Sequence, residues 1–120
     1  MKILIVEDNP ANAQLIMDLL QLWGYAYKDV NTVSAAIESL ASEHFDLLLL
    51  DMVLPGRPGY ELIPKIKKLS PNICIVVMTG QDDPALERKV RDLGIHHYLH
   101  KPFSIKALEK TLHELVPQTT

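Results

Sequence analysis

The chain has little cysteine, no excess of positive charge and no long apolar run. Its single cysteine, Cys74, lies in the apolar segment 73–78, which excludes a disulfide framework and predicts a buried, inert thiol. Lysine and arginine number 12 against 15 aspartates and glutamates, a net charge of -3, which does not favour nucleic acid or an anionic membrane as a direct partner. No apolar run approaches ~18 residues and no signal-peptide pattern opens the chain, so we expect a cytoplasmic protein.

The length of the chain favours one compact unit. A chain of 120 residues can bury one hydrophobic core but not two. Hydrophobic residues make up 48% and charged residues 22%, which is ordinary for a globular protein. No linker, repeat or low-complexity segment interrupts the pattern. We therefore expect a single domain over 1–120, with a core over 2–116 and a short C-terminal tail over 117–120.

Apolar strand patterns alternate with helix-start signals along the sequence. Buried strands are predicted at 2–6, 47–50, 73–78 and 95–100, and a more polar edge strand at 25–30. Helices are predicted after each strand, with N-cap signals at Asn9-Pro10, Thr32, Asp83-Pro84 and Ser104. The helical segment 60–69 contains Pro64, which either lies in the first turn of a helix that starts late or kinks it. We favour the late start.

The alternation predicts the fold class. Five strand–helix units with short connections form a parallel sheet with helices on both faces, joined by right-handed crossovers. A sheet of this kind most often has the strand order 2-1-3-4-5. We therefore expect an α/β protein with a flavodoxin-like (βα)5 fold.

Polar residues follow four of the predicted strands. Glu7 and Asp8 follow the first, Asp51 the third, Thr79 the fourth and Lys101 the fifth. In the expected strand order these ends are neighbours, and the carboxyl ends of parallel strands are where ligands bind. Three carboxylates together repel one another unless a cation lies among them, and hard oxygen ligands suit Mg²⁺. With an exposed carboxylate nucleophile at Asp51, a lysine and a hydroxyl, the set suits a phosphoryl group.

These motifs together resemble the receiver domain of response regulators in bacterial two-component signalling. The resemblance covers nearly the whole chain. It is carried by Val6-Glu7-Asp8, by Asp51 followed by Leu54-Pro55 and Gly59, by Met78-Thr79-Gly80, and by Lys101-Pro102-Phe103. Each motif alone has little specificity, but their order and their places on the predicted elements are characteristic of the family.

The resemblance implies a role for each site residue. Asp51 accepts the phosphoryl group from the phosphohistidine of a sensor histidine kinase or a histidine phosphotransfer protein. Asp8 and Asp51 ligate Mg²⁺ (or Mn²⁺) together with the main-chain carbonyl of Val53, and Glu7 contributes to the acidic pocket. Thr79 and Lys101 contact the phosphoryl oxygens. The family acts as a switch on a partner or output domain and not as an enzyme on an external substrate.

The resemblance also implies how the switch works. Thr79 moves toward the phosphoryl group and Tyr98 turns inward, which changes the face formed by the fourth helix, fifth strand and fifth helix. That face is also a candidate for a homodimer, and the peptide bond between Lys101 and Pro102 is expected to be cis. The expected face carries basic residues at Arg88, Lys89, Arg91 and Lys106.

This sequence departs from the family pattern in the loop after Asp51. Pro58 stands where many relatives have an acid, so this loop is expected to be stiffer than usual. Val53 and Gln81 occupy positions that tune the lifetime of the phosphoryl group in the family, and their identity leaves that lifetime open.

Two other classes of protein share part of this pattern. A haloacid-dehalogenase-like phosphatase also uses an aspartate nucleophile and Mg²⁺, but it needs a second acid two residues later, where this chain has Val53. A flavin- or nucleotide-binding module is disfavoured because Asn9-Pro10, and no glycine-rich loop, follows the first strand. His96 and His100 share a strand face about 13 Å apart, too far for one ion. Taken singly, Asp51 could be a turn residue and Tyr98 a core residue.

Overall fold

The computed structural model describes residues 2–54, 57–80, 83–102 and 104–115. Pro55, Gln81 and Phe103 lie outside this part of the chain, and so does the tail over 117–120. The first half contains β1 (Lys2–Val6), α1 (Pro10–Leu22), β2 (Ala26–Val30), α2 (Val33–Ser42), β3 (Leu47–Asp51) and β4 (Val53–Leu54). The second half contains β5 (Arg57–Pro58), the 3-10 helix η1 (Gly59–Leu62), α3 (Ile63–Leu69), β6 (Cys74–Thr79), α4 (Pro84–Asp92), β7 (His97–His100) and α5 (Ile105–Leu115).

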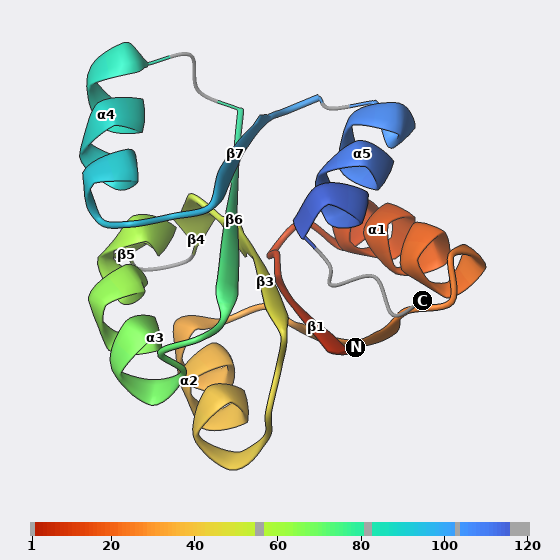
Figure 1. The fold of residues 1–120 in the computed structure, drawn as a ribbon, viewed down its shortest axis with the longest axis horizontal. Helices are drawn as coiled ribbons and strands as arrows, with labels where there is room; N and C mark the ends of the chain where they lie inside the picture. The colour runs from red at the N-terminus through yellow and green to blue at the C-terminus, as the bar shows by residue number, and fades with distance from the viewer. Residues whose placement is uncertain (1, 55–56, 81–82, 103, 116–120) are drawn as a thin grey trace.

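Five of the strands form one parallel sheet of order β2-β1-β3-β6-β7. Once the separate two-stranded β4–β5 hairpin is set aside, this is the expected order 2-1-3-4-5. Helices α1 and α5 cover one face of the sheet, and α2, α3 and α4 cover the other (Figure 1). The predicted α/β, flavodoxin-like fold is confirmed.

Strand β3 is the centre of both cores. Its side chains alternate between the faces of the sheet. Leu48 and Leu50 pack with residues of α2, α3 and α4, whereas Leu47 and Leu49 pack with residues of α1 and α5. All four leucines are at most 1% exposed, and full burial of each stabilises the fold by about 1.5–3 kcal/mol. The four-leucine run is therefore what makes β3 a strand buried on both faces.

The helix starts follow the predicted capping signals. Asn9 Oδ1 accepts a hydrogen bond from Asn12 N, Thr32 Oγ1 from Ala35 N, and Asp83 Oδ1 from Leu86 N. Pro10 and Pro84 occupy the first turns of α1 and α4, where the missing N–H has no intrahelical partner to lose.

The chain around Pro64 confirms the late helix start. Pro64 lies in the first turn of α3, and the residues before it form the separate 3-10 helix η1. The predicted helix over 60–69 is thus two segments. Strand boundaries differ from the prediction by one or two residues: β6 begins at Cys74, β7 begins at His97, and Asp51 is the last residue of β3. Within the described residues, no helix has the length and apolar character needed to cross a membrane.

Candidate functional site

The carboxyl ends of four neighbouring strands deliver the predicted site residues. Glu7 follows β1, Asp51 ends β3, Thr79 ends β6, and Lys101 follows β7. The parallel register pairs Val6 with Leu50, Asp51 with Met78, and Thr79 with His100, so the strands end at nearly the same level. The sheet itself therefore brings these side chains to one edge.

Three carboxylates converge at this edge. Oxygen atoms of Glu7, Asp8 and Asp51 all lie within 4.8 Å of one another. Glu7 is 1% exposed and Asp51 5% exposed, whereas Asp8 is exposed to solvent. Carboxylates at this distance repel one another, and burial strengthens the repulsion because the surroundings screen it less than water.

Lys101 supplies the compensating positive charge. Its Nζ lies 3.0 and 2.9 Å from the two Glu7 carboxylate oxygens and 3.4 Å from Asp51 Oδ2. The lysine side chain is 18% exposed, so this ion pair is shielded from water. One ammonium against three carboxylates leaves the cluster with an excess of negative charge. That excess, on hard oxygen ligands, fits a divalent cation such as Mg²⁺.

Asp51 is buried, so the expectation of an exposed carboxylate is wrong. Strand β3 lies between β1 and β6, and Gly59 folds back against it, with Gly59 N donating to Met52 O at 2.7 Å. Val53 N donates to Asp51 Oδ1 at 3.2 Å. Burial, together with the nearby Glu7 carboxyl, raises the pKa of Asp51 to about 6.

The predicted switch residues lie on β6 and β7, the two strands that follow β3 in the sheet. Thr79 is fully buried at the end of β6, and Tyr98 on the neighbouring β7 is 5% exposed. Burial raises the pKa of the Tyr98 phenol. The Tyr98 ring is therefore turned into the protein in this structure. The peptide bond between Lys101 and Pro102 is cis.

Part of the basic face on α4 is engaged within the molecule. Arg91 Nε donates to Glu87 Oε2 at 2.9 Å, and its guanidinium carbon lies 5.6 Å from the centre of the Tyr98 ring. Lys89 Nζ lies 5.0 Å from the centre of the Tyr60 ring. Arg88 and Lys106 are exposed. The two engaged side chains are thus structural contacts of α4 as well as candidates for a partner surface.

Two residues at the site were not assigned a side-chain or packing role from the sequence. Asn12 Nδ2 donates to Glu7 Oε1 at 3.1 Å, and a Cβ atom at Gly59 would lie 1.9 Å from the Asp51 carbonyl oxygen. The sequence offered a weak signal for each: Asn12 stands one helical turn after the N-cap Asn9, and Gly59 stands in the loop after Asp51. The contacts themselves depend on how the helix and the loop are placed.

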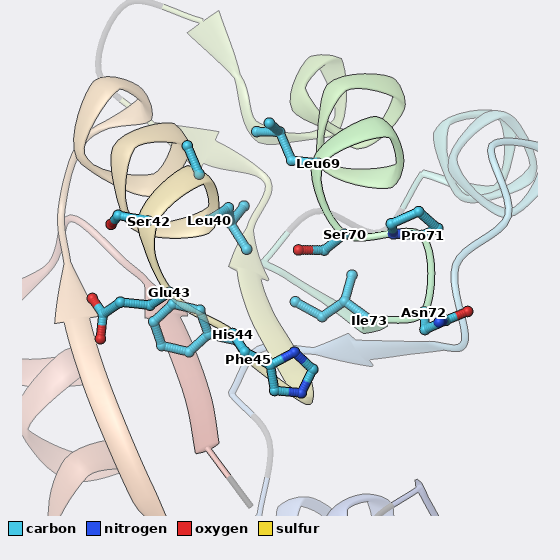
Figure 2. Close-up of a pocket in the computed structure, with 11 residues that line it drawn as sticks. Leu40, Ser42, Glu43, His44, Phe45, Leu69, Ser70, Pro71, Asn72 and Ile73 are labelled. Atoms are coloured by element: carbon cyan, nitrogen blue, oxygen red, sulfur yellow. The ribbon is translucent and has the colours of Figure 1, made fainter.

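Two hollows on the surface differ in their relation to these residues. One, of about 300 Å³, is lined by Asn12, Leu15, Ile16, Lys101 and Pro102 and adjoins the carboxylates. The other, of about 340 Å³, lies between the end of α2 and the loop that joins α3 to β6, with the side chains of Leu40, Phe45, Leu69 and Ile73 around it (Figure 2). No candidate site residue lines the second hollow.

Comparison with known proteins gives one consistent family. The family model described as the response regulator receiver domain matches residues 3–113. The transcriptional regulatory protein BasR of Escherichia coli (strain K12) is 32% identical over 116 residues, which cover 97% of this chain and 52% of BasR. The chain spans between 12% and 52% of the length of eight curated relatives that it matches.

Solved structures agree with this comparison. A CheY-like response regulator receiver domain protein from Methanospirillum hungatei JF-1 has a TM-score of 0.89 and 28% identity, covering 94% of this chain and 90% of that one. The receiver domain of sensor histidine kinase PA1611 from Pseudomonas aeruginosa PAO1 has a TM-score of 0.84 and 29% identity, covering 95% of each chain. That structure has a magnesium ion coordinated in its active site cleft.

Proposed function

Because the chain belongs to the response regulator receiver domain family of two-component signalling, we propose that Asp51 is its phosphoacceptor. The observation that carries this proposal is the convergence of Glu7, Asp8 and Asp51 within 4.8 Å, with Lys101 against two of them. The donor is the phosphohistidine of a sensor histidine kinase or a histidine phosphotransfer protein. We propose Mg²⁺ (or Mn²⁺) as the cofactor, held by Asp8, Asp51 and the Val53 carbonyl, with Glu7 completing the acidic pocket.

The proposed reaction is a transfer of one phosphoryl group. An ionised Asp51 oxygen attacks the phosphorus atom, the bond from phosphorus to the donor histidine nitrogen breaks, and that nitrogen keeps the electron pair. The donor ring carries a proton on its other nitrogen, so it leaves as neutral imidazole. Asp8, Asp51 and the Val53 carbonyl would hold the cation, which would supply positive charge to neutralise the phosphoryl group. Lys101 Nζ lies 3.4 Å from Asp51 Oδ2. It is therefore close enough to donate a hydrogen bond to an oxygen of a phosphoryl group attached to that atom. Thr79 offers a hydroxyl from the neighbouring strand.

The proposed output is a change of the face formed by α4, β7 and α5. The new negative charge on Asp51 attracts Thr79 and Lys101. Tyr98 already faces the interior, so the change at Tyr98 is a shift in its packing as Thr79 moves. Tyr98 contacts α4 through Arg91, so a change at Tyr98 reaches this face directly. A small change of charge thus biases a packing arrangement with two states. The partner or output domain that binds this face, and a homodimer through it, are proposals that rest on the family.

Phosphorylation of the purified chain tests the assignment. With Mg²⁺ and acetyl phosphate, intact mass spectrometry should show one added phosphoryl group. Asp51→Asn should show none, because the amide is not a nucleophile for this transfer. Asp18→Asn is a matched control, since Asp18 is an exposed acid of α1 outside the site. Phosphorylation of Asp51→Asn to the wild-type level would contradict the proposal.

A phosphatase of the haloacid-dehalogenase type is the second candidate. It shares the aspartate nucleophile, but the position two residues after Asp51 holds Val53, whose side chain is apolar and 56% exposed. No proton can be donated to a leaving group from that position. We therefore propose that the domain is not an enzyme on external substrates. Steady hydrolysis of added p-nitrophenyl phosphate, absent in Asp51→Asn, would reverse this choice.

A further inference from the structure

The buried Glu7 carboxylate is held by a second side chain besides Lys101. Asn12 Nδ2 donates to Glu7 Oε1 at 3.1 Å, on the same oxygen that Lys101 Nζ contacts at 3.0 Å. A carboxylate only accepts hydrogen bonds, so the NH₂ group of the amide must face Glu7. A 1% exposed carboxylate with fewer partners would be costly, because burial removes the water that would otherwise solvate it.

The start of α1 fixes where Asn12 stands. Asn9 Oδ1 accepts the backbone N–H of Asn12 at 3.1 Å, and Pro10 holds the first turn. A side chain three residues after an N-cap points back toward the chain that enters the helix, as in the capping box. Here the side chain reaches past the cap to Glu7, two residues before it. The helix start and the acidic cluster are thus joined by one hydrogen bond.

We propose that Asn12 is a positioning residue for the metal site, acting through Glu7. This inference rests on the proposed function, in which Lys101 moves from Glu7 to a phosphoryl oxygen. When Lys101 leaves, Glu7 loses its ion pair, and the Asn12 amide still holds the carboxylate in place. Because the amide is neutral, it orients Glu7 without cancelling the negative charge that attracts the cation. Hydrogen bonds to groups around a metal site typically change metal affinity 10–100-fold when they are removed.

Magnesium affinity measures this role directly. Isothermal titration calorimetry with MgCl₂ should give Asn12→Ala a dissociation constant about 10-fold higher than that of the wild type. The rate of phosphorylation by acetyl phosphate at saturating Mg²⁺ should fall less than the affinity does, because the lost contact acts on Glu7 and not on the reacting atoms. Asn12→Gln retains the amide on a longer side chain and should recover part of the affinity.

The controls separate this role from a structural one. Alanine is a better helix former than asparagine, so Asn12→Ala does not weaken α1 through helix propensity. Asn12→Leu, which nearly matches asparagine in shape and has no donor, should show the same loss of affinity. Gln14→Ala removes an amide from the same helix that contacts exposed Asp18, and should bind Mg²⁺ as the wild type does.

The outcomes distinguish this inference from the function on which it rests. Wild-type affinity in both Asn12→Ala and Asn12→Leu would overturn the role of Asn12 and leave the phosphoacceptor proposal intact. A wild-type chain that binds no Mg²⁺ and takes up no phosphoryl group would overturn both. A 10-fold loss in Gln14→Ala as well would show a general effect of α1 and would also overturn the role of Asn12.

Discussion

At the scale of single residues, close backbone packing around Asp51 limits which side chains the neighbouring positions can hold. Asp51 is held between two strands, and the loop that follows it turns back so closely that only a glycine fits at position 59. A Cβ atom there would lie 1.9 Å from the Asp51 carbonyl oxygen and 3.0 Å from its carbonyl carbon. Both atoms are backbone, so neither can move without moving Asp51.

This contact predicts a specific effect of Gly59→Ala. Relief of the clash must shift the loop or the end of β3, and overpacking of this kind typically costs about 1–3 kcal/mol. The same shift moves Asp51, the proposed phosphoacceptor, so phosphorylation by acetyl phosphate should also slow. Urea unfolding gives the free energy, and intact mass spectrometry gives the rate. Gly80→Ala is the steric control for stability, because the nearest atom to a Cβ there is 4.0 Å away. Equal stability of the two variants would contradict this reading of Gly59.

At the scale of elements, ion pairs connect the C-terminal end of α2 to two strands. Glu43, the C-cap residue of α2, accepts hydrogen bonds from Lys2 Nζ on β1 and from Lys28 Nζ on β2, the latter at 2.6 Å. These two lysines lower the pKa of Glu43 to about 2. All three side chains are partly exposed to solvent, which limits what the contacts contribute to stability.

The lowered pKa of Glu43 predicts a pH-dependent effect of Glu43→Gln. In the unfolded chain the Glu43 carboxyl has its ordinary pKa of 4.5. Above that pH the carboxyl is ionised in both states, and its contacts with the two lysines stabilise the folded state in full. The variant should be less stable than the wild type at pH 7, and the difference should shrink as pH falls from 4.5 toward 2. Urea midpoints at pH 7 and pH 3.5, and at low and high salt, measure it.

A control on the same helix gives the comparison for Glu43. Glu38→Gln removes an exposed acid of α2 and should change the midpoint less than Glu43→Gln at pH 7. A difference between Glu43→Gln and the wild type that stays constant from pH 7 to pH 3.5 would show that ionisation of Glu43 has no part in it.

The elements also show what sequence patterns can and cannot predict. The five parallel strands and the helix starts follow from local signals such as the run Leu47–Leu50 and the Asn9-Pro10 cap, and these were confirmed. The hairpin of β4 and β5 was not predicted, because each strand has only two residues and Pro58 lies in one of them. Pairs so short carry no periodicity, and their geometry is set by the return of the loop to Asp51.

Some features of the site could likewise be predicted from the sequence, and others could not. Glu7, Asp51, Thr79 and Lys101 could be predicted to converge because parallel strands deliver their carboxyl ends to one edge. The burial of Asp51 could not, because it depends on how the loop that contains Gly59 folds back over β3. The contact from Asn12 to Glu7 depends on the rotation of α1 about its axis, which no local pattern specifies to the accuracy of a hydrogen bond.

At the scale of the whole molecule, folding brings together the carboxylates of Glu7, Asp8 and Asp51, which repel one another. Glu7 and Asp8 follow β1 and are far from Asp51 along the unfolded chain, but the sheet brings the three carboxylates within 4.8 Å of one another. Lys101 offsets part of this repulsion. A cation that binds only the folded cluster must therefore stabilise the fold, by RT ln(1 + [L]/Kd) for one site.

This linkage predicts that Mg²⁺ raises the unfolding temperature of the metal-free protein. At ten times the dissociation constant, the added stability is about 1.4 kcal/mol. For a domain of this size, that corresponds to a rise of roughly 5 °C. Thermal unfolding in MgCl₂, compared with NaCl at equal ionic strength, separates specific binding from screening. Asp8→Asn should lose most of the rise, because exposed Asp8 has little role in the core but supplies one of the three carboxylates. An equal rise in Asp8→Asn and wild type would show that the cation binds elsewhere.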